Sequence, residues 1–293
     1  MRIYITGGTG FVGSNLARKL LQMNDEVAIL KREQSSLQYI DDIKDDIKFY
    51  DYEYSYSSID QSLYDFLPEI VIHLASYYTY DHNVNEIDSL LESNIRLGLY
   101  LIESLSNNGI TKLINTGTSF EHFQNENYKP VNIYAATKHA FQNLIYYYTD
   151  SKKLSSITLK LFDTYGPGDK RKKLIWLLKN SVINQKELKL SSGEQVLDLV
   201  HINDVVGAYQ TAIKLMENAE IGFNEKYGVS GKDRVTLKEL VRMVENITEA
   251  NINAKFGALP YRNREVMKPW DNFRKLPGWE PEYSLFNGLK EIF

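Results

Sequence analysis

A tyrosine and a lysine four residues apart, Tyr134 and Lys138, are the side chains of this sequence whose types and spacing best fit acid–base chemistry. On a helix, residues four apart lie on one face, about one turn from each other. A free tyrosine has a pKa of about 10, so it is a poor acid or base at neutral pH unless a cation stabilises its phenolate. We therefore predict that Lys138 lowers the pKa of Tyr134. A hydroxyl from a strand end, Thr116 or its neighbours, is expected to hold the substrate oxygen, as ketone reduction or alcohol oxidation requires.

Tyrosine is plentiful here, at 21 residues, so the pair alone also arises by chance. What favours chemistry is a glycine cluster upstream, which follows a β-branched run and opens a helical pattern, the order of a dinucleotide-binding turn. Gly7 allows the tight turn, Gly10 lets the backbone approach a pyrophosphate, and Gly13 lets the helix pack on the sheet. The pyrophosphate is expected at the helix N-terminus, which begins with Phe11 and Val12.

The end of the predicted second strand, 26–30, indicates which dinucleotide binds. An NAD-binding chain places an acid there to hold the ribose 2′-hydroxyl, whereas this chain has Lys31 and Arg32. Because an acid would repel a 2′-phosphate and these cations attract it, we predict that NADP(H) is preferred and that NAD(H) is possible. The alternative is a pair of solvated charges. Further cofactor contacts are expected where two later strands end, at Asp51, Leu74, Ala75 and Ser76. His73 is expected to be a hydrogen-bonded core histidine.

Composition excludes several classes of function. The 293 residues include no cysteine, which excludes disulfides, thiolate metal sites and a cysteine nucleophile, and no metal site is predicted. A net charge of -4 gives no reason to expect a nucleic acid or an anionic membrane as partner. The basic run 170–173 is expected to be a solvated loop or helix start. No apolar stretch is long enough to span a membrane, and Met1 leads directly into a strand, so a cytoplasmic location is expected.

Strand and helix patterns alternate up to about Gly168, including a helix that Tyr134 opens. Such alternation predicts an α/β fold, a Rossmann-type doubly wound parallel sheet, with a smaller C-terminal substrate-binding lobe. We expect the dinucleotide-binding domain to cover 1–165, with a returning segment at about 195–218, and the substrate-binding lobe to lie mainly in 166–293. Thr236 and Glu239 fit a capping box that opens a helix in that lobe.

The order of these motifs resembles the extended short-chain dehydrogenase/reductases that act on nucleotide sugars. The resemblance covers nearly the whole chain and rests on Gly7–Gly13, His73–Ser76, Thr116, Tyr134 with Lys138, Tyr165–Pro167, Gln195–Asp204 and Gly278–Trp279. Within that family, the segment Ile114–Lys138 is most similar to the CDP-abequose and CDP-paratose synthases, which reduce the C4 ketone of a CDP-linked 3,6-dideoxyhexulose.

The resemblance implies roles for individual residues. Tyr134 becomes the general acid, Lys138 its electrostatic partner, and Thr116 the hydrogen-bond donor to the substrate oxygen. Thr116 is preferred over Thr118 because Phe120 then falls where the family usually has a tyrosine. The expected substrate-binding residues are Thr118, Asp163 and Arg262, the last matching an arginine that binds the diphosphate.

Three departures from the family pattern affect substrate binding. Asp163 replaces an asparagine, Leu197 replaces an arginine, and Lys160 stands for an arginine. Arg262 together with Arg264 is therefore expected to carry more of the phosphate recognition.

The resemblance implies an NADPH-dependent reductase of a nucleotide-linked 4-keto-deoxy sugar, in deoxysugar biosynthesis for surface polysaccharide such as O-antigen. Dehydration is disfavoured because Gly117 and Thr118 replace the acidic pair of the dehydratases. Two alternatives stay open: a 4-epimerase with tightly bound NAD, and a non-catalytic dinucleotide-binding sensor, which the presence of both Tyr134 and Lys138 disfavours. The resemblance also implies a homodimer.

Overall fold

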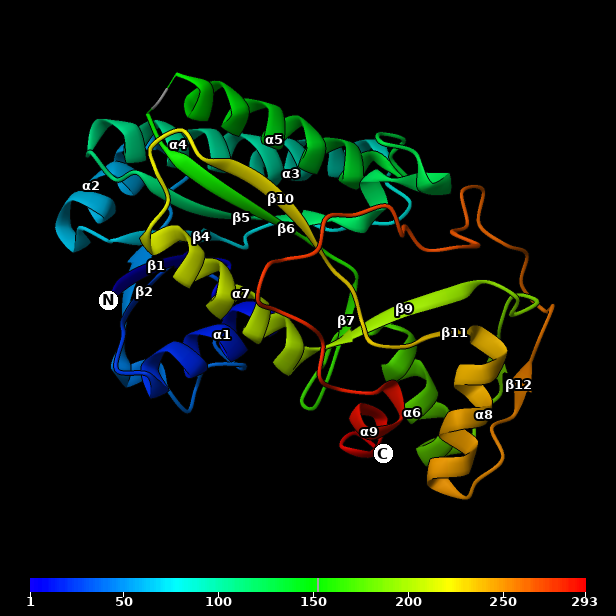
Figure 1. The fold of residues 1–293 in the computed structure, drawn as a ribbon. Coiled ribbons are helices and arrows are strands. Elements are labelled where there is room, and N and C mark those ends of the chain that lie inside the picture. The colour runs from blue at the N-terminus through cyan, green and yellow to red at the C-terminus, as the bar shows by residue number, and fades with distance from the viewer. Residues whose placement is uncertain (152) are drawn as a thin grey trace.

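The large sheet of the protein has seven strands, all parallel, in the order β10-β6-β5-β4-β1-β2-β3 (Figure 1). The computed structural model describes residues 1–151 and 153–293, and it confirms the predicted doubly wound α/β fold. The strands are β1 (Arg2–Thr6), β2 (Glu26–Lys31), β3 (Ile47–Asp51), β4 (Ile70–His73), β5 (Lys112–Thr118), β6 (Ser155–Leu161) and β10 (Asn224–Val229).

Helices cover both faces of this sheet (Figure 1). One face carries α1 (Phe11–Gln22) and α7 (Ile202–Glu217), and the other carries α2 (Tyr56–Phe66), α4 (Leu97–Asn107) and α5 (Ile133–Asp150). Alternate side chains of one strand serve the two cores: Ile3 and Ile5 pack toward α1 and α7, whereas Tyr4 packs toward α2 and α4. The strands therefore consist of nearly continuous apolar runs, as parallel strands buried on both faces must.

The chain is helical from Ile87 to Asn107, but the middle of this segment is a π-helical turn. This turn, Glu92–Arg96, joins α3 (Ile87–Leu91) to α4. It carries the buried Asn94, whose side-chain oxygen accepts from the Tyr77 backbone N–H at 2.8 Å and whose amide donates to Thr137 Oγ1 at 3.0 Å. The wider turn thus links the loop after β4 to α5, the helix that carries Tyr134.

A smaller lobe follows the sixth strand. It contains a three-stranded sheet, a two-stranded sheet and a third apolar core. Its elements are β7 (Asp163–Tyr165), α6 (Leu174–Asn184), β8 (Leu188–Lys189), β9 (Val196–His201), β11 (Arg234–Thr236), α8 (Leu237–Thr248), β12 (Ala254–Lys255) and α9 (Leu285–Lys290). The capping box predicted at Thr236 and Glu239 is confirmed.

The chain returns to the large sheet over a longer segment than 195–218. Within that range α7 packs on the large sheet, while β9 belongs to the three-stranded sheet of the lobe. Beyond it, β10 forms the edge strand beside β6, and the late residues Trp270 and Leu276 enter the core under that edge. In the described part of the chain, no helix combines the length and the apolar character needed to cross a membrane.

Candidate active site

A cavity of about 450 Å³ opens at the carboxyl ends of β1, β4 and β5. Its wall joins residues that the sequence placed in three separate motifs. The predicted site residues that line it are Gly7, Gly10, Phe11, Val12, Gly13, Lys31, Arg32, Leu74, Ala75, Ser76, Thr116, Thr118, Tyr134 and Asp163. Three predicted site residues remain. Asp51 is paired with Lys31 and Lys138 lies one helical turn from Tyr134, so both are next to residues of this wall. Arg262 lines a second cavity.

The glycine turn fits a dinucleotide pyrophosphate for steric reasons. Gly7 has a φ of +73°, and a Cβ there would lie 2.6 Å from the Ala75 nitrogen. Both the backbone conformation and the lack of space therefore exclude a larger residue at this position. A Cβ on Gly13 would lie 2.4 Å from the Gly7 oxygen, which confirms its role in close helix packing. Gly10 is the N-cap residue of α1, and no side chain caps the helix there. The first N–H groups of the helix are therefore left for an anion.

The two cations expected near the 2′-phosphate have different surroundings. Lys31 lies opposite Asp51 in the register of β2 and β3, and its ammonium forms an ion pair with that carboxylate at 2.5 Å. Arg32 lines the cavity beside Ser35, whose hydroxyl accepts from the Arg32 backbone N–H at 3.0 Å. No ion pair of the Arg32 side chain is found in the described residues. Arg32 therefore offers the less neutralised charge.

Tyr134 and Lys138 lie one turn apart on α5, as predicted, and Asn132 caps that helix by accepting from the Ala135 N–H at 3.0 Å. The predicted lowering of the Tyr134 pKa is wrong: burial raises the pKa of Tyr134 to about 12. Burial also lowers the pKa of Lys138 to about 8, against a weaker opposing effect of Glu121. Removing water penalises the charged form of both groups. At neutral pH Tyr134 therefore keeps its proton, as a general acid must.

The two candidate threonines, Thr116 and Thr118, have different partners. Both lie on β5, which extends to Thr118. The Thr116 hydroxyl lies 2.6 Å from the Tyr209 hydroxyl, beneath the cavity. Thr118 Oγ1 accepts from the Phe120 N–H at 3.3 Å and caps the turn that follows. The assignment of the substrate-binding hydroxyl to Thr116 stays a prediction.

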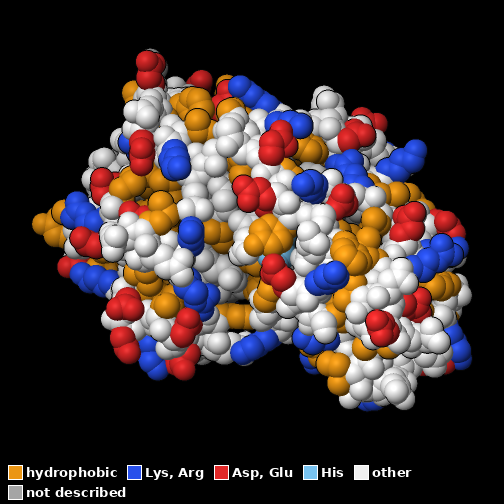
Figure 2. All heavy atoms as spheres, turned by 60° about the horizontal axis from the view of Figure 1, so that its bottom comes forward, with side chains coloured by type: hydrophobic (Ala, Val, Ile, Leu, Met, Phe, Trp, Pro, Cys, Tyr) orange, Lys and Arg blue, Asp and Glu red, His pale blue; other side chains and the backbone are white. Residues whose placement is uncertain are grey.

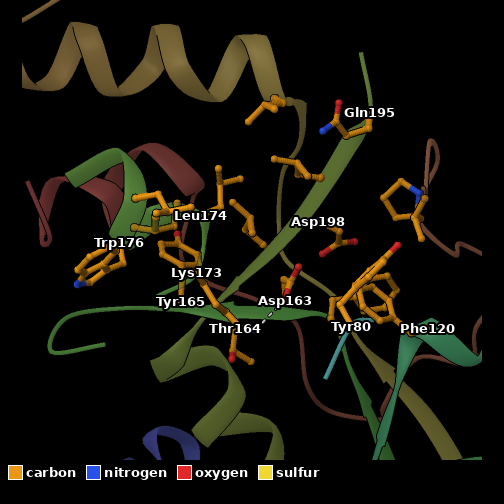
Figure 3. Close-up of a pocket in the computed structure, with 18 of the residues that line it drawn as sticks. Tyr80, Phe120, Asp163, Thr164, Tyr165, Lys173, Leu174, Trp176, Gln195 and Asp198 are labelled. Carbon is orange, nitrogen blue, oxygen red and sulfur yellow. Dashed lines mark hydrogen bonds and ion pairs between the residues drawn. The ribbon is translucent and has the colours of Figure 1, made fainter. Parts of the chain in front are cut away.

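A second cavity, of about 740 Å³, adjoins the first between the large sheet and the smaller lobe. Tyr80, Phe120 and Asp163 point into it from one side and Trp176 lies at its far end (Figure 3). Figure 2 shows a hollow between the two parts of the molecule, with Lys and Arg side chains around it. Among the residues lining this cavity, Arg262 places its guanidinium 3.9 Å from the ring centre of Tyr80.

The basic run 170–173 leads into α6 with Lys173 as the N-cap residue, which confirms the expected helix start, and it also lines both cavities. Lys170, Lys172 and Lys173 line the second cavity, and Arg171 and Lys173 line the first. Arg171 lies 4.6 Å from the ring centre of Phe11, at the start of α1. Its place in the cavity walls was missed because it depends on how α6 docks, which no local pattern reports. By contrast, Arg264 is absent from both cavity walls, and its guanidinium carbon lies 4.5 Å from the ring centre of Phe123.

Comparison with known proteins agrees with this geometry. Residues 3–225 match the model of the NAD dependent epimerase/dehydratase family. The chain belongs to this family. As a member of the NAD-dependent epimerase/dehydratase family, it is an NAD(P)-dependent oxidoreductase of the extended short-chain type, with a nicotinamide dinucleotide as cofactor.

Relatives and solved structures of the family match almost the full chain. The CDP-abequose synthase of Yersinia pseudotuberculosis is 29% identical over 94% of each chain. The CDP-abequose synthase of Salmonella typhimurium is 26% identical over 99% of this chain and 96% of its own. The fold is similar to that of the UDP-glucose 4-epimerase of Thermus thermophilus in complex with NAD, with a TM-score of 0.84, 22% identity, and coverage of 99% and 97%.

One buried cluster of this family member was not anticipated from its sequence. Glu121 is fully buried and accepts from Lys160 Nζ at 3.0 Å and from Gln142 Nε2 at 2.6 Å, and His139 Nδ1 lies 3.0 Å away. Burial alone would raise the pKa of Glu121, but His139 and Lys160 lower it to about 2. The Lys160 ammonium also lies 2.7 Å from His122 Nε2. This cluster joins the turn after β5 to β6 and α5, directly behind Lys138.

His73 has the core position that the sequence indicated, but only one of its ring nitrogens is bonded. Nδ1 lies 2.7 Å from Thr6 Oγ1, whereas the buried Nε2 has no partner in the described residues. Burial, and to a smaller extent the charge of Lys138, lowers the pKa of His73 to about 3. The ring is therefore neutral at physiological pH.

Every carboxylate that lines the two cavities is engaged by another group of the described chain. Asp163 pairs with Lys173 at 2.9 Å, and although burial alone would raise its pKa, Lys173 holds it below the usual value. The engaged carboxylates are Glu92, Asp163, Asp169, Asp198 and Glu265. Tyr134, in the wall of the first cavity, can thus deliver a proton without first breaking an ion pair.

Proposed function

We propose that this enzyme is an NADPH-dependent reductase of a nucleotide-linked 4-keto-deoxy sugar, with a CDP-4-keto-3,6-dideoxyhexose as the favoured substrate. Two relatives that match over almost their whole length are named CDP-abequose synthases, and the similar solved structure is a UDP-glucose 4-epimerase. Together these support a nucleotide sugar as substrate. The reaction would belong to deoxysugar biosynthesis for surface polysaccharide.

The proposed chemistry uses three side chains. When bound, the cofactor supplies a hydride to the carbonyl carbon. Tyr134 donates its phenolic proton to the carbonyl oxygen as negative charge develops there, and Lys138 stabilises the phenolate that remains. Thr116 donates a second hydrogen bond to the same oxygen. Solvent then returns a proton to Tyr134, so that one ketone, one hydride from the cofactor and one proton from solvent would give one alcohol, with the cofactor left oxidised.

We assign recognition of the diphosphate to cations that line the second cavity. Arg262 is held on the Tyr80 ring, which fixes the plane of its guanidinium, and a planar fork suits phosphate oxygens. Lys172 and Lys173 reach the same cavity from the start of α6. Because Lys173 is paired with Asp163, we infer that Lys172 supplies most of the charge expected from the arginine that Leu197 replaces.

The observation that carries the choice of reaction is the engagement of every cavity carboxylate. Elimination of water needs a second acid–base pair beside the tyrosine, whereas Asp163 is paired with Lys173, and Gly117 and Thr118 carry no carboxylate. Simple reduction needs one proton donor, and Tyr134 supplies it. This arrangement favours a reductase over a dehydratase.

The second candidate is a 4-epimerase with tightly bound NAD, which the solved structure of similar fold favours. The two functions differ in the fate of the cofactor: a reductase consumes and exchanges it, whereas an epimerase retains it. Arg32, with Ser35 beside it, supports a 2′-phosphate and therefore the reductase.

We also infer a homodimer formed by the exposed apolar face of α3 and α5. Tyr146 and Tyr147 on α5 are 58% and 60% exposed, and Ile87 and Leu91 on α3 are also exposed. Light scattering at two protein concentrations tests this inference, because a monomer at both would contradict it.

The decisive assay follows NADPH oxidation with CDP-, dTDP-, UDP- and GDP-linked 4-keto-6-deoxy sugars, including a 3,6-dideoxy member. Stoichiometric oxidation with one substrate is expected, and the Tyr134→Phe variant should lose about 10²- to 10⁴-fold in rate. Interconversion of epimers without net oxidation, by protein that carries its own NAD, would replace the proposal with the epimerase. Full activity of Tyr134→Phe would remove the catalytic assignment.

A further inference from the structure

Tyr209, in the middle of α7, is a polar residue inside an apolar core. Its side chain is fully buried among residues of the core between α1, α7 and the large sheet. Its hydroxyl lies 2.6 Å from Thr116 Oγ1, at the carboxyl end of β5. Thr116 in turn lines the first cavity, of about 450 Å³, together with Tyr134. A buried tyrosine is thus connected to the reaction site through one threonine hydroxyl.

The direction of this hydrogen bond follows from the surroundings of Tyr209. Burial raises the pKa of Tyr209, so the phenol stays protonated and has one proton to donate. Thr116 Oγ1 is the acceptor that the structure gives it. A buried hydroxyl that donates to nothing costs about 1–3 kcal/mol. Tyr209 therefore donates and Thr116 accepts.

This direction decides what Thr116 can do. A threonine hydroxyl has one proton and two acceptor sites. Because the bond from Tyr209 occupies an acceptor site, the Thr116 proton stays available for an oxygen in the cavity. Donation from below also polarises the threonine hydroxyl and makes it a better donor. If the direction were reversed, Thr116 would have no proton for the substrate.

We propose that Tyr209 is a positioning residue that aims the Thr116 proton at the substrate carbonyl oxygen. This inference rests on the proposed ketone reduction and adds a residue that neither the glycine turn nor the tyrosine–lysine pair contains. It also gives a physical reason to separate the two threonines. Thr116 is oriented from the core by a phenol, whereas Thr118 is oriented by the backbone of the turn that it caps.

The test compares Tyr209→Phe, Thr116→Val and the double variant with the wild type in the NADPH oxidation assay. Tyr209→Phe keeps the ring in the core and removes only the hydroxyl. Its kcat is expected to fall about 3- to 10-fold, the loss of one hydrogen bond, with the KM for both substrates within about twofold of wild type. Thr116→Val should lose about 10²-fold or more in kcat.

The double variant separates positioning from a purely structural role. If Tyr209 acts through Thr116, the double variant is no slower than Thr116→Val alone. Tyr4→Phe is the matched control, because Tyr4 is equally buried and its hydroxyl also lies 2.6 Å from a hydroxyl, that of Ser62, on the other face of the sheet. Tyr4→Phe should leave kcat unchanged.

Three outcomes would overturn the inference: unchanged kcat in Tyr209→Phe, an equal loss in Tyr4→Phe, or losses from Tyr209→Phe and Thr116→Val that multiply in the double variant. Failure of the proposed function looks different, because the wild type itself would then oxidise no NADPH. If the wild type interconverts epimers instead, the same variants are compared in that reaction, since its ketone intermediate needs the same hydrogen-bond donor.

Discussion

The Lys31 ammonium and the Asp51 carboxylate form an ion pair at 2.5 Å, at the ends of the neighbouring strands β2 and β3. This pair neutralises one of the two cations that the sequence assigned to the cofactor. If NADPH is the cofactor, as we propose, its discrimination from NADH would therefore depend mainly on Arg32. The acid at the end of β3 does not repel a 2′-phosphate freely, because Lys31 holds it.

Replacing Arg32 by alanine is expected to raise the KM for NADPH about 10-fold or more, since a charge-assisted hydrogen bond contributes about 1.5–3 kcal/mol. The KM for NADH should change little, because NADH has no 2′-phosphate. Steady-state kinetics with both cofactors measure this. Lys48→Ala is the control, as Lys48 is an ion-paired cation on β3 outside both cavity walls. An unchanged preference for NADPH in Arg32→Ala would contradict the assignment.

The activity is expected to fall as the pH rises through about 8, because the pKa of Lys138 is about 8 and only its protonated form stabilises the Tyr134 phenolate. A profile of kcat against pH between 6 and 10 measures this. Lys138→Met should be much slower and should lose the decline near pH 8. A wild-type profile that stays flat to pH 10 would show that Lys138 does not control the rate.

Arg262→Ala is expected to raise the KM for the nucleotide sugar about 10- to 100-fold and to change kcat less, because a diphosphate contact is present before and during the reaction. The comparison is with Arg242→Ala on α8, an exposed arginine outside both cavity walls. A lowered kcat with an unchanged KM would place Arg262 nearer to the reacting carbon than to the diphosphate.

Glu121→Gln is expected to destabilise the protein by about 3–5 kcal/mol, because it leaves Lys160 buried without its counter-charge. Urea unfolding measures this, with the exposed acid Glu53→Gln as control, for which a change within about 0.5 kcal/mol is expected. Replacing Lys160 by methionine as well should restore part of the loss. If the double variant is no more stable than Glu121→Gln, the ion pair is not the source of the effect.

The same carboxylate predicts the acid side of the stability curve. The folded pKa of Glu121, about 2, lies below its ordinary value of 4.5. Its contribution to stability is therefore complete above about pH 4.5 and is lost as the pH falls toward 2. In Glu121→Gln this part of the pH dependence should disappear.

Patterns within single segments of the sequence predicted most of the fold and several residues of the candidate site. The glycine turn, the apolar strands and the tyrosine–lysine pair on α5 depend on neighbours a few residues away, so the sequence alone was enough to find them. The capping box at Thr236 belongs to the same class. The register of β2 and β3 is different: it brings Lys31 to Asp51, and no local signal indicates that the two would neutralise each other.

The contacts that were missed join residues far apart in the sequence. Thr116 and Tyr209 are 93 positions apart, and Lys160 and Glu121 are 39 apart. Their contacts depend on how α7 and β6 pack, which follows from the whole sheet. The direction of the Tyr134 pKa was also wrong in the sequence prediction, because burial in the folded site raises this pKa and outweighs the hydrogen bond with Ser76, which lowers it.

The edge strand β10 and the loop that carries Trp270 and Leu276 complete the large sheet late in the chain. During synthesis, the ribosome releases the glycine turn well before these residues. The nascent dinucleotide half therefore exposes the open edge of β6 until most of the protein has emerged. Native pairing at that edge must wait until β10 has emerged, which makes chaperone binding to the nascent chain most useful in this interval.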